Sequence, residues 1–190
     1  MSVVRARRWT RAEYDRLVDV GLLHPDEPVE LIEGEIVEMP PQHGQHATAI
    51  VLAQEALRAV FGHGFVVRVQ LPLALGAYSE PEPDLAVVAG SPRDHVAEHP
   101  SSAVLVVEVA DATLTFDRET KGSLYAKAGI PEYWLVNVVH RQVEVYRDPG
   151  PMPEAVYGSG YRSRTVAVPG DTISVLARPG AQVAVADLLP

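Results

Sequence analysis

The run Ala103-Val104-Leu105-Val106-Val107-Glu108-Val109 is the stretch that decides the fold. Its valine and leucine residues form a continuous apolar segment of strand length, which is typical of a buried strand. One acidic residue, Glu108, stands near its end, and a carboxylate is costly to bury unless a metal ion or a nearby ammonium neutralises it. The run therefore predicts a buried strand whose acid needs a cation.

A second acid and a lysine complete a candidate site. Asp84 ends the stretch Glu80-Pro81-Glu82-Pro83-Asp84, directly before another apolar run, so it lies at the start of a second predicted strand. Lys121 follows on a predicted helix, on a face that is otherwise apolar by helical spacing. A lysine in that position needs a partner of opposite charge, and a carboxylate on a strand would supply one.

The remaining pattern predicts helices early and in the middle of the chain, with strands between and after them. This order indicates an α/β (α+β) fold with a central mixed β-sheet flanked by helices. Thr10 and Glu13 form a capping box, Asp117 is placed to cap the helix of Lys121, and Gly129 is placed to end that helix. The expected strands span residues 28–32, 35–39, 65–73, 85–89, 104–109, 133–138, 142–147, a pair within 155–168, and 172–176.

Composition limits the class of protein. The chain of 190 residues is expected to form one domain over residues 1–190. It has no cysteine and no apolar run of about 18 residues, so we expect a cytoplasmic protein without disulfides or a membrane span. The formal net charge of -9 argues against promiscuous nucleic-acid binding, but not against a nuclease with local DNA contacts. Basic residues gather near the two ends, where solvated surface charge also explains them: Arg5, Arg7, Arg8 and Arg11, then Arg162 and Arg164.

Two carboxylates on neighbouring strands suit a divalent metal site. Mg²⁺ commonly takes one or two carboxylates together with water and substrate phosphate, and Mn²⁺ is an alternative. Asp84 and Glu108 could hold such an ion, while Lys121 would orient the attacking water or stabilise charge on the phosphate. The same residues also suit a structural arrangement, in which Glu108 and Lys121 form a buried ion pair and Asp84 caps a turn. Glu82 could replace Asp84 as the ligand, so the spacing leaves these alternatives open.

Two blocks of sequence resemble a known family. The first is Glu30-Leu31-Ile32-Glu33-Gly34-Glu35-Ile36-Val37-Glu38-Met39-Pro40-Pro41, followed by His46 and Pro83-Asp84. The second contains Val107-Glu108-Val109, Asp117, Lys121, Tyr125 and the distinctive Gly129-Ile130-Pro131-Glu132-Tyr133-Trp134-Leu135-Val136. From about Trp9 to Leu189, the chain looks like the Uma-type putative restriction endonucleases of the PD-(D/E)XK nuclease superfamily.

The resemblance implies a restriction-endonuclease-like core and Mg²⁺-dependent endonucleolytic cleavage of DNA. Asp84 and Glu108 would be the metal ligands, and Lys121 would position the water. In the wider superfamily a lysine usually follows the acid two positions later, which here is Ala110. In this family the lysine is thought to have moved to the following helix, which Lys121 matches. A homodimer would suit cleavage of both strands of a duplex, although no residue specifies one.

Four further residues are candidates for supporting roles. Asp117 would orient Lys121 or the start of its helix. Asp111 stands where family members commonly carry a serine- and proline-containing turn, and it could support the metal, cap the helix or mark altered chemistry. His46 could contact phosphate or be a surface histidine. Glu33, before a glycine, could be an accessory acid or a turn residue.

Two other functions are compatible with the same residues. A non-catalytic nucleic-acid-binding or scaffold protein could retain the nuclease fold. The acidic net charge and Asp111 favour that alternative, whereas the joint presence of Asp84, Glu108 and Lys121 disfavours it. A metal-dependent hydrolase acting on another phosphoester would use the same site.

Overall fold

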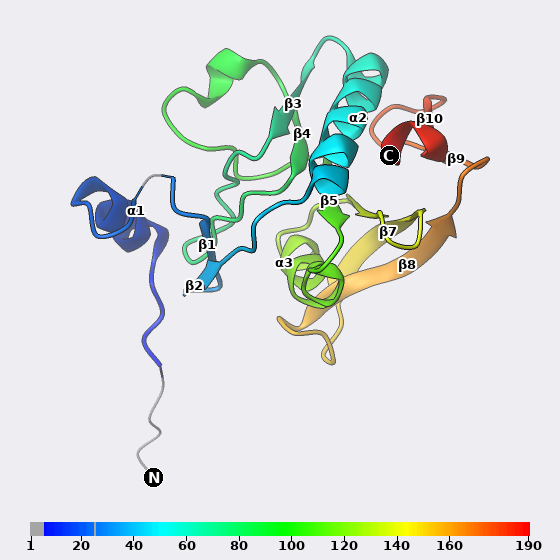
Figure 1. Ribbon diagram of the computed structural model, residues 1–190. Helices are drawn as coiled ribbons and strands as arrows, with labels where there is room; N and C mark the ends of the chain where they lie inside the picture. Colours follow the sequence, from blue (N-terminus) through cyan, green and yellow to red (C-terminus); the bar gives the residue numbers. More distant parts are fainter. Residues whose placement is uncertain (1–5, 25) are drawn as a thin grey trace.

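The fold is built on a six-stranded mixed sheet with a helix packed on each face (Figure 1). The computed structural model describes residues 6–24 and 26–190, and Arg5 lies outside the described residues. The sheet has the order β3-β4-β5-β6-β7-β8, in which β5 and β6 are parallel and the other neighbours are antiparallel. Its strands are β3 (Phe65–Val69), β4 (Leu85–Ala89), β5 (Leu105–Ala110), β6 (Glu132–Asn137), β7 (Gln142–Pro151) and β8 (Ser159–Ala167).

Alternation along the strands divides the core into two halves. Successive side chains of a strand point to opposite faces, so Val107 and Val109 of β5 pack with helix α2 (Gly44–Phe61). Val106 and Ala110 pack on the other side, with the helix α3 (Gly122–Lys127). Glu108 has the parity of Val106, so its carboxylate emerges on the side of α3. The strand period alone therefore turns Glu108 toward the helix that follows it.

The helical segment that carries Lys121 begins earlier and is wider than predicted. The prediction that Asp117 caps this helix is wrong, because its N–H donates to the Thr113 carbonyl at 2.9 Å and it already lies inside the helical segment. Residues Phe116–Lys121 form a π-turn, η2, in which the N–H of Gly122 donates to the Asp117 carbonyl five residues back. Turns of this kind are rare and are found frequently at functional sites.

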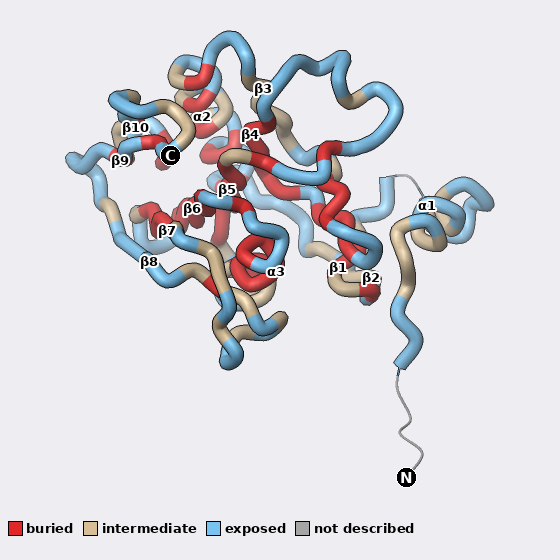
Figure 2. The backbone as a smooth tube through the Cα atoms, turned by 180° about the vertical axis from the view of Figure 1, so that it is seen from behind, coloured by how far each residue is buried: buried red, intermediate tan, exposed pale blue. Residues whose placement is uncertain are grey.

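Helix α1 (Arg11–Asp19) lies to one side of the sheet. The predicted capping box is confirmed: the N–H of Glu13 donates to Thr10 Oγ1 at 3.3 Å, and the Glu13 carboxylate accepts from the Thr10 N–H at 3.0 Å. Figure 2 shows that α1 contains no buried residue, whereas buried residues concentrate in the central strands, α2 and α3. The helix is attached to the rest of the chain by hydrogen bonds, from the Tyr14 hydroxyl to the Val29 carbonyl at 3.0 Å and from the Arg11 N–H to the Ala77 carbonyl at 2.9 Å.

The strands predicted at 28–32 and 35–39 are confirmed, and they pair antiparallel as a hairpin of β1 (Val29–Ile32) and β2 (Glu35–Glu38). It is attached to the segment that leads to Asp84, because the N–H of Glu80 donates to the Leu31 carbonyl at 2.7 Å. Leu31 is fully buried. The hairpin thus occupies a fixed place beside the start of β4.

Two strand predictions differ from the structure. Strand β3 ends at Val69 because Gln70 adopts a left-handed φ of 49° and Pro72 lacks an N–H to donate to a neighbouring strand. The pair of strands expected within 155–168 is instead the single strand β8, which pairs with β7. The chain ends with β9 (Thr172–Ser174), β10 (Gln182–Ala184) and the 3₁₀ turn η3 (Val185–Leu188). None of the helices within residues 6–24 and 26–190 is both long and apolar enough to span a membrane.

Gly129 should be important for stability, because it adopts the left-handed conformation that ends the helix after Lys121. It adopts a φ of 73° just after α3, so Gly129→Ala is expected to lower the free energy of unfolding by about 1 kcal/mol through left-handed strain. Gly122→Ala is the matched control on the same helix. Gly122 has a φ of -57°, and a Cβ there would meet ordinary contacts of 3.6 and 3.7 Å, so stability should stay equal or rise by up to about 1 kcal/mol. Urea unfolding measures both, and equal losses would contradict this assignment.

Candidate active site

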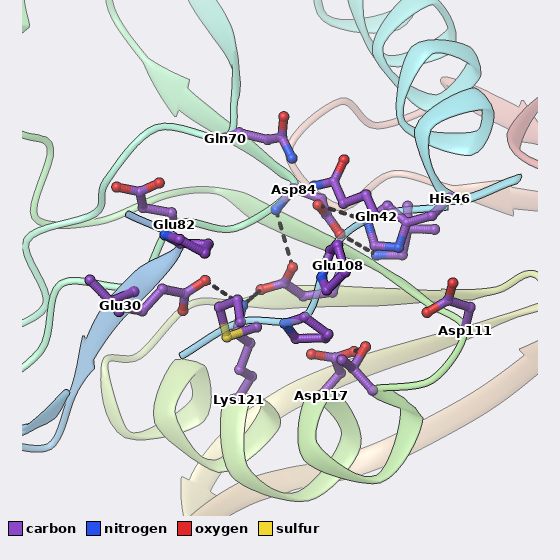
Figure 3. Close-up of a pocket in the computed structure, with 17 residues that line it drawn as sticks. Glu30, Gln42, His46, Gln70, Glu82, Asp84, Glu108, Asp111, Asp117 and Lys121 are labelled. Carbon is purple, nitrogen blue, oxygen red and sulfur yellow. Dashed lines mark hydrogen bonds and ion pairs between the residues drawn. The ribbon is translucent and has the colours of Figure 1, made fainter. Parts of the chain in front are cut away.

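A cavity of about 520 Å³ opens between the hairpin, the start of α2 and the π-turn (Figure 3). Acidic side chains dominate its charged lining, together with one lysine and one histidine. The charged and histidine residues that line it are Glu30, Glu82, Asp84, Glu108, Asp111, Asp117, Lys121 and His46. The structure therefore brings together all but one of the site residues predicted from the sequence, and adds Glu30.

Asp84 and Glu108 are joined by hydrogen bonds that cross between β4 and β5. The N–H of Asp84 donates to Glu108 Oε2 at 3.1 Å, and the N–H of Val109 donates to Asp84 Oδ2 at 2.8 Å. Each carboxylate thus accepts a hydrogen bond from a backbone N–H of the neighbouring segment, directly before β4 begins at Leu85. This exchange fixes both carboxylates relative to the sheet.

Lys121 is buried between two carboxylates. Its Nζ lies 3.0 Å from Glu108 Oε1 and 3.0 Å from Glu30 Oε1, and the residue is only 2% exposed. The expected proximity of Lys121 to Glu108 is confirmed. Glu108 Oε1 also accepts the hydroxyl hydrogen of the fully buried Tyr125 at 2.6 Å.

The free acceptor positions of Asp84 and Glu108 determine whether a cation fits between them. A carboxylate has about four lone-pair positions. Glu108 uses both positions on Oε1 and one on Oε2, while Asp84 uses one on each oxygen. Acceptor capacity on Asp84 and on Glu108 Oε2 therefore fits an oxygen-ligated ion. Among the residues that the structure describes, no group of three or more histidine or acidic side chains is arranged to hold a metal ion by itself. A cation here would accordingly need water or substrate as further ligands.

The electrostatics of the cavity show an excess of negative charge. Burial raises the pKa of Glu108 to about 8, although the Lys121 ammonium opposes the shift. Burial also raises the pKa of Asp117 to about 6, again against Lys121. Burial tends to lower the pKa of Lys121, but the carboxylates of Glu108 and Glu30 outweigh it and the pKa is raised. Lys121 is therefore a stable ammonium, yet one ammonium does not neutralise these acids.

His46, in the first turn of α2, faces Asp84. Its Nε2 lies 3.2 Å from Asp84 Oδ1, and the residue is 8% exposed. Burial tends to lower the pKa of His46, but the hydrogen bond and charge of Asp84 outweigh it, so the pKa is raised. The interpretation of His46 as a surface histidine is therefore wrong: it is a buried partner of Asp84.

The other supporting candidates occupy different positions. The Asp117 carboxylate accepts the hydroxyl hydrogen of Thr113, and Asp111 lines the cavity beyond the end of β5. Glu33 lies outside the cavity, in the hairpin turn with a left-handed φ of 50°. Its Oε2 lies 2.7 Å from Arg8 and 2.7 Å from Lys127.

The sequence analysis missed Glu30 as a site residue. The signal was nevertheless present, because Glu30 is an acid between apolar neighbours in a predicted strand, as Glu108 is. Gln42 and Gln70 also line the cavity, but their amide side chains carry no comparable sequence signal. Only the folded hairpin shows which acid meets Lys121.

Known proteins similar to this chain are described as putative nucleases. A family described as "Putative restriction endonuclease", Uma2, matches residues 11–186. The chain belongs to the Uma2 family. Among solved structures, it is similar to a putative nuclease belonging to DUF820 from Anabaena variabilis ATCC 29413, with 22% identity and a TM-score of 0.68. That match covers 90% of this chain and 96% of the other, which confirms the predicted fold. No curated protein matches the chain.

Protonation of the buried Asp117 carboxylate should contribute to the pH dependence of the free energy of unfolding. Its pKa is about 6 in the fold against an ordinary 3.8, so between about pH 4 and pH 6 the folded protein binds more protons than the unfolded chain. Its contribution to the free energy of unfolding therefore falls as the pH rises through this window. Asp117→Asn should flatten the slope measured by urea unfolding at pH 4, 5 and 6, whereas the exposed Asp187→Asn should keep the wild-type slope. An unchanged slope in Asp117→Asn would contradict the assignment.

Proposed function

We propose that this protein is a metal-dependent endonuclease that hydrolyses phosphodiester bonds in DNA. The observation that carries the proposal is the meeting of Asp84, Glu108 and the Lys121 ammonium in one cavity, with Lys121 Nζ 3.0 Å from Glu108. Membership of a family described as putative restriction endonucleases supports the reaction class. A pair of interacting copies, one for each strand of a duplex, is part of the proposal.

Asp84 and Glu108 would hold Mg²⁺, or Mn²⁺ in its place, through the free lone pairs of Asp84 and Glu108 Oε2. When bound, the ion supplies a Lewis acid that polarises the phosphate and lowers the pKa of a bound water. Lys121 donates to the attacking water or to a phosphate oxygen as charge develops there. His46 holds Asp84 through Oδ1, whereas the Val109 N–H bonds to the other oxygen, Oδ2.

Charge explains why a cation belongs in this mechanism. A DNA phosphate that approaches the cavity meets a lining in which acidic side chains outnumber the one lysine and the one histidine. The net charge of -9 gives no general attraction to compensate. A divalent cation would add two positive charges to this acidic lining. It would also give Glu108, which shares Lys121 with Glu30, a second positive partner.

A second candidate function is a non-catalytic nucleic-acid-binding or scaffold protein with the same fold. One observation favours it: each oxygen of Asp84 and Glu108 already accepts a hydrogen bond or ion pair within the protein. Such a closed network would hold the sheet and helix together without any ion. DNA binding by the wild type without cleavage in Mg²⁺ or Mn²⁺ would establish this alternative over the nuclease.

Cleavage of supercoiled plasmid tests the nuclease proposal. With Mg²⁺ or Mn²⁺ the wild type should nick or linearise the plasmid, and chelation with EDTA should abolish cleavage. Asp84→Asn and Lys121→Met should each slow cleavage by about 10² to 10³-fold, because each removes a ligand or a donor at the phosphate.

Matched controls separate chemistry from folding in that assay. Asp187→Asn changes an exposed acid, and Lys127→Met changes an outward lysine in α3, the helix that Lys121 precedes. Both variants should cleave like wild type. Circular dichroism checks that every variant is folded. Equal cleavage by Asp84→Asn, Lys121→Met and wild type would contradict the mechanism, and cleavage of a simple phosphodiester but not of DNA would reassign the substrate.

Metal binding should also stabilise the fold. A ligand that binds only the folded state at about 100 times its dissociation constant adds about 2.7 kcal/mol, which raises the melting temperature by roughly 5–10 °C for a chain of this size. Differential scanning fluorimetry with Mn²⁺ should show this rise in wild type and lose it in Asp84→Asn. A rise of equal size in Asp84→Asn would place the ion elsewhere.

A further inference from the structure

Glu30 is a buried acid with no role in the reaction proposed above. It lies in β1 and is 4% exposed, with Oε1 3.0 Å from Lys121 Nζ (Figure 3). Its second oxygen, Oε2, is buried without a hydrogen-bond partner. A buried acceptor left unpaired costs free energy, so packing alone gives no reason to keep a glutamate at this position.

The two carboxylates beside Lys121 are not equivalent. Glu108 also accepts from the Tyr125 hydroxyl and the Asp84 N–H, and in the proposed reaction it shares its charge with a cation. Glu30 bonds only to Lys121 among the hydrogen bonds and ion pairs of the described residues. Lys121 therefore has one anchor that belongs to the metal site and one that does not.

The hairpin that carries Glu30 is itself firmly placed. The neighbouring Leu31 and Ile32 are 0% and 2% exposed. The Glu80 N–H donates to the Leu31 carbonyl at 2.7 Å, and the Gly34 N–H donates to the Tyr78 carbonyl at 2.7 Å. Both acceptor and donor come from the chain that runs directly into Asp84. Glu30 is thus fixed relative to Asp84 as well as to Lys121.

We propose that Glu30 is a positioning residue, which holds the Lys121 ammonium in the site independently of Glu108 and makes the hairpin β1–β2 part of the active site. The inference rests on the proposed nuclease function for its catalytic consequence. When Glu108 turns its charge toward a cation, Lys121 keeps its place because Glu30 retains it. Loss of Glu30 then impairs the turnover step, in which Lys121 acts, and leaves metal binding by Asp84 and Glu108 in place.

The first measurement needs neither metal nor DNA. Nitrogen-15 NMR of the lysine side chains detects an ammonium only when its protons exchange slowly, as a buried and hydrogen-bonded group requires. Wild type should show the Lys121 ammonium signal, assigned by its loss in Lys121→Met. Glu30→Ala and Glu30→Gln should lose or shift that signal, whereas Glu35→Gln, an exposed glutamate in the same hairpin, should retain it. An unchanged signal in Glu30→Ala overturns the proposal whatever the protein does to DNA.

The second measurement is steady-state plasmid cleavage over a range of Mg²⁺ concentrations. Glu30→Ala should lower kcat by about 10 to 100-fold, since misplacement of a catalytic group by about 1 Å costs rates of that order. The KM and the Mg²⁺ concentration for half-maximal rate should change by less than about threefold, and Glu30→Gln, which keeps an acceptor oxygen, should recover part of kcat. Glu35→Gln should match wild type.

The two measurements separate the outcomes. A kcat in Glu30→Ala equal to that of Glu35→Gln overturns the catalytic consequence. So does an unchanged kcat with a higher Mg²⁺ concentration for half-maximal rate, because that result would make Glu30 a metal ligand. If wild type cuts no DNA, the nuclease function fails, and the NMR signal alone decides whether Glu30 holds Lys121. Urea unfolding of Glu30→Gln identifies any loss that comes from unfolding.

Discussion

The buried ammonium of Lys121 is the constraint on which the rest of the site depends. A charge that is 2% exposed is tolerated only when carboxylates replace the water that it has lost, and Glu108 and Glu30 do so at 3.0 Å each. Glu108 and Lys121 come from a strand and the helical segment that follows it, whereas Glu30 comes from a hairpin far away in the sequence. Removing the Lys121 ammonium would leave both carboxylates without a countercharge in the interior, so the three elements must keep their relative positions.

The sheet and the π-turn supply that fixed geometry. Period-two alternation in β5 sends Glu108 toward α3, while the π-turn places Lys121 at the start of that helix. The Tyr133 hydroxyl donates to the Asp117 carbonyl at 3.0 Å, which ties the turn to β6. Because β6 is parallel to β5, the helix between them crosses back over the face from which Glu108 emerges. The connection between the strands thus delivers the lysine to the acid.

The electrostatic balance of the cavity distinguishes a ligand site from an ordinary ion pair. A structural pair of Glu108 and Lys121 would be neutral, whereas the lining adds Asp84, Asp117 and Glu30 to it. Burial raises the pKa of Glu108 to about 8, the neighbouring carboxylates of Asp84 and Asp117 raise it further, and the Lys121 ammonium only partly opposes the shift. Burial disfavours the charged forms of these acids, and a divalent cation bound in the cavity would favour them. The proposed nuclease function, which includes a bound divalent cation, explains why so many acids line this cavity.

The sequence by itself determined the elements and most of the site. Apolar patterns predicted the strands 28–32 and 35–39 and the strands around Asp84 and Glu108, and the apolar face of its helix pointed Lys121 inward. These features depend on neighbouring residues, so a local pattern is sufficient. Tertiary structure decided that Asp117 sits inside a π-turn, that Glu33 pairs with Arg8 and Lys127, and that Glu30 meets Lys121. Those outcomes depend on which distant elements pack together. The sequence therefore predicted that the opening acid, Glu108, needed a cation, but only the packed hairpin showed that two acids share one lysine and leave the cavity negative.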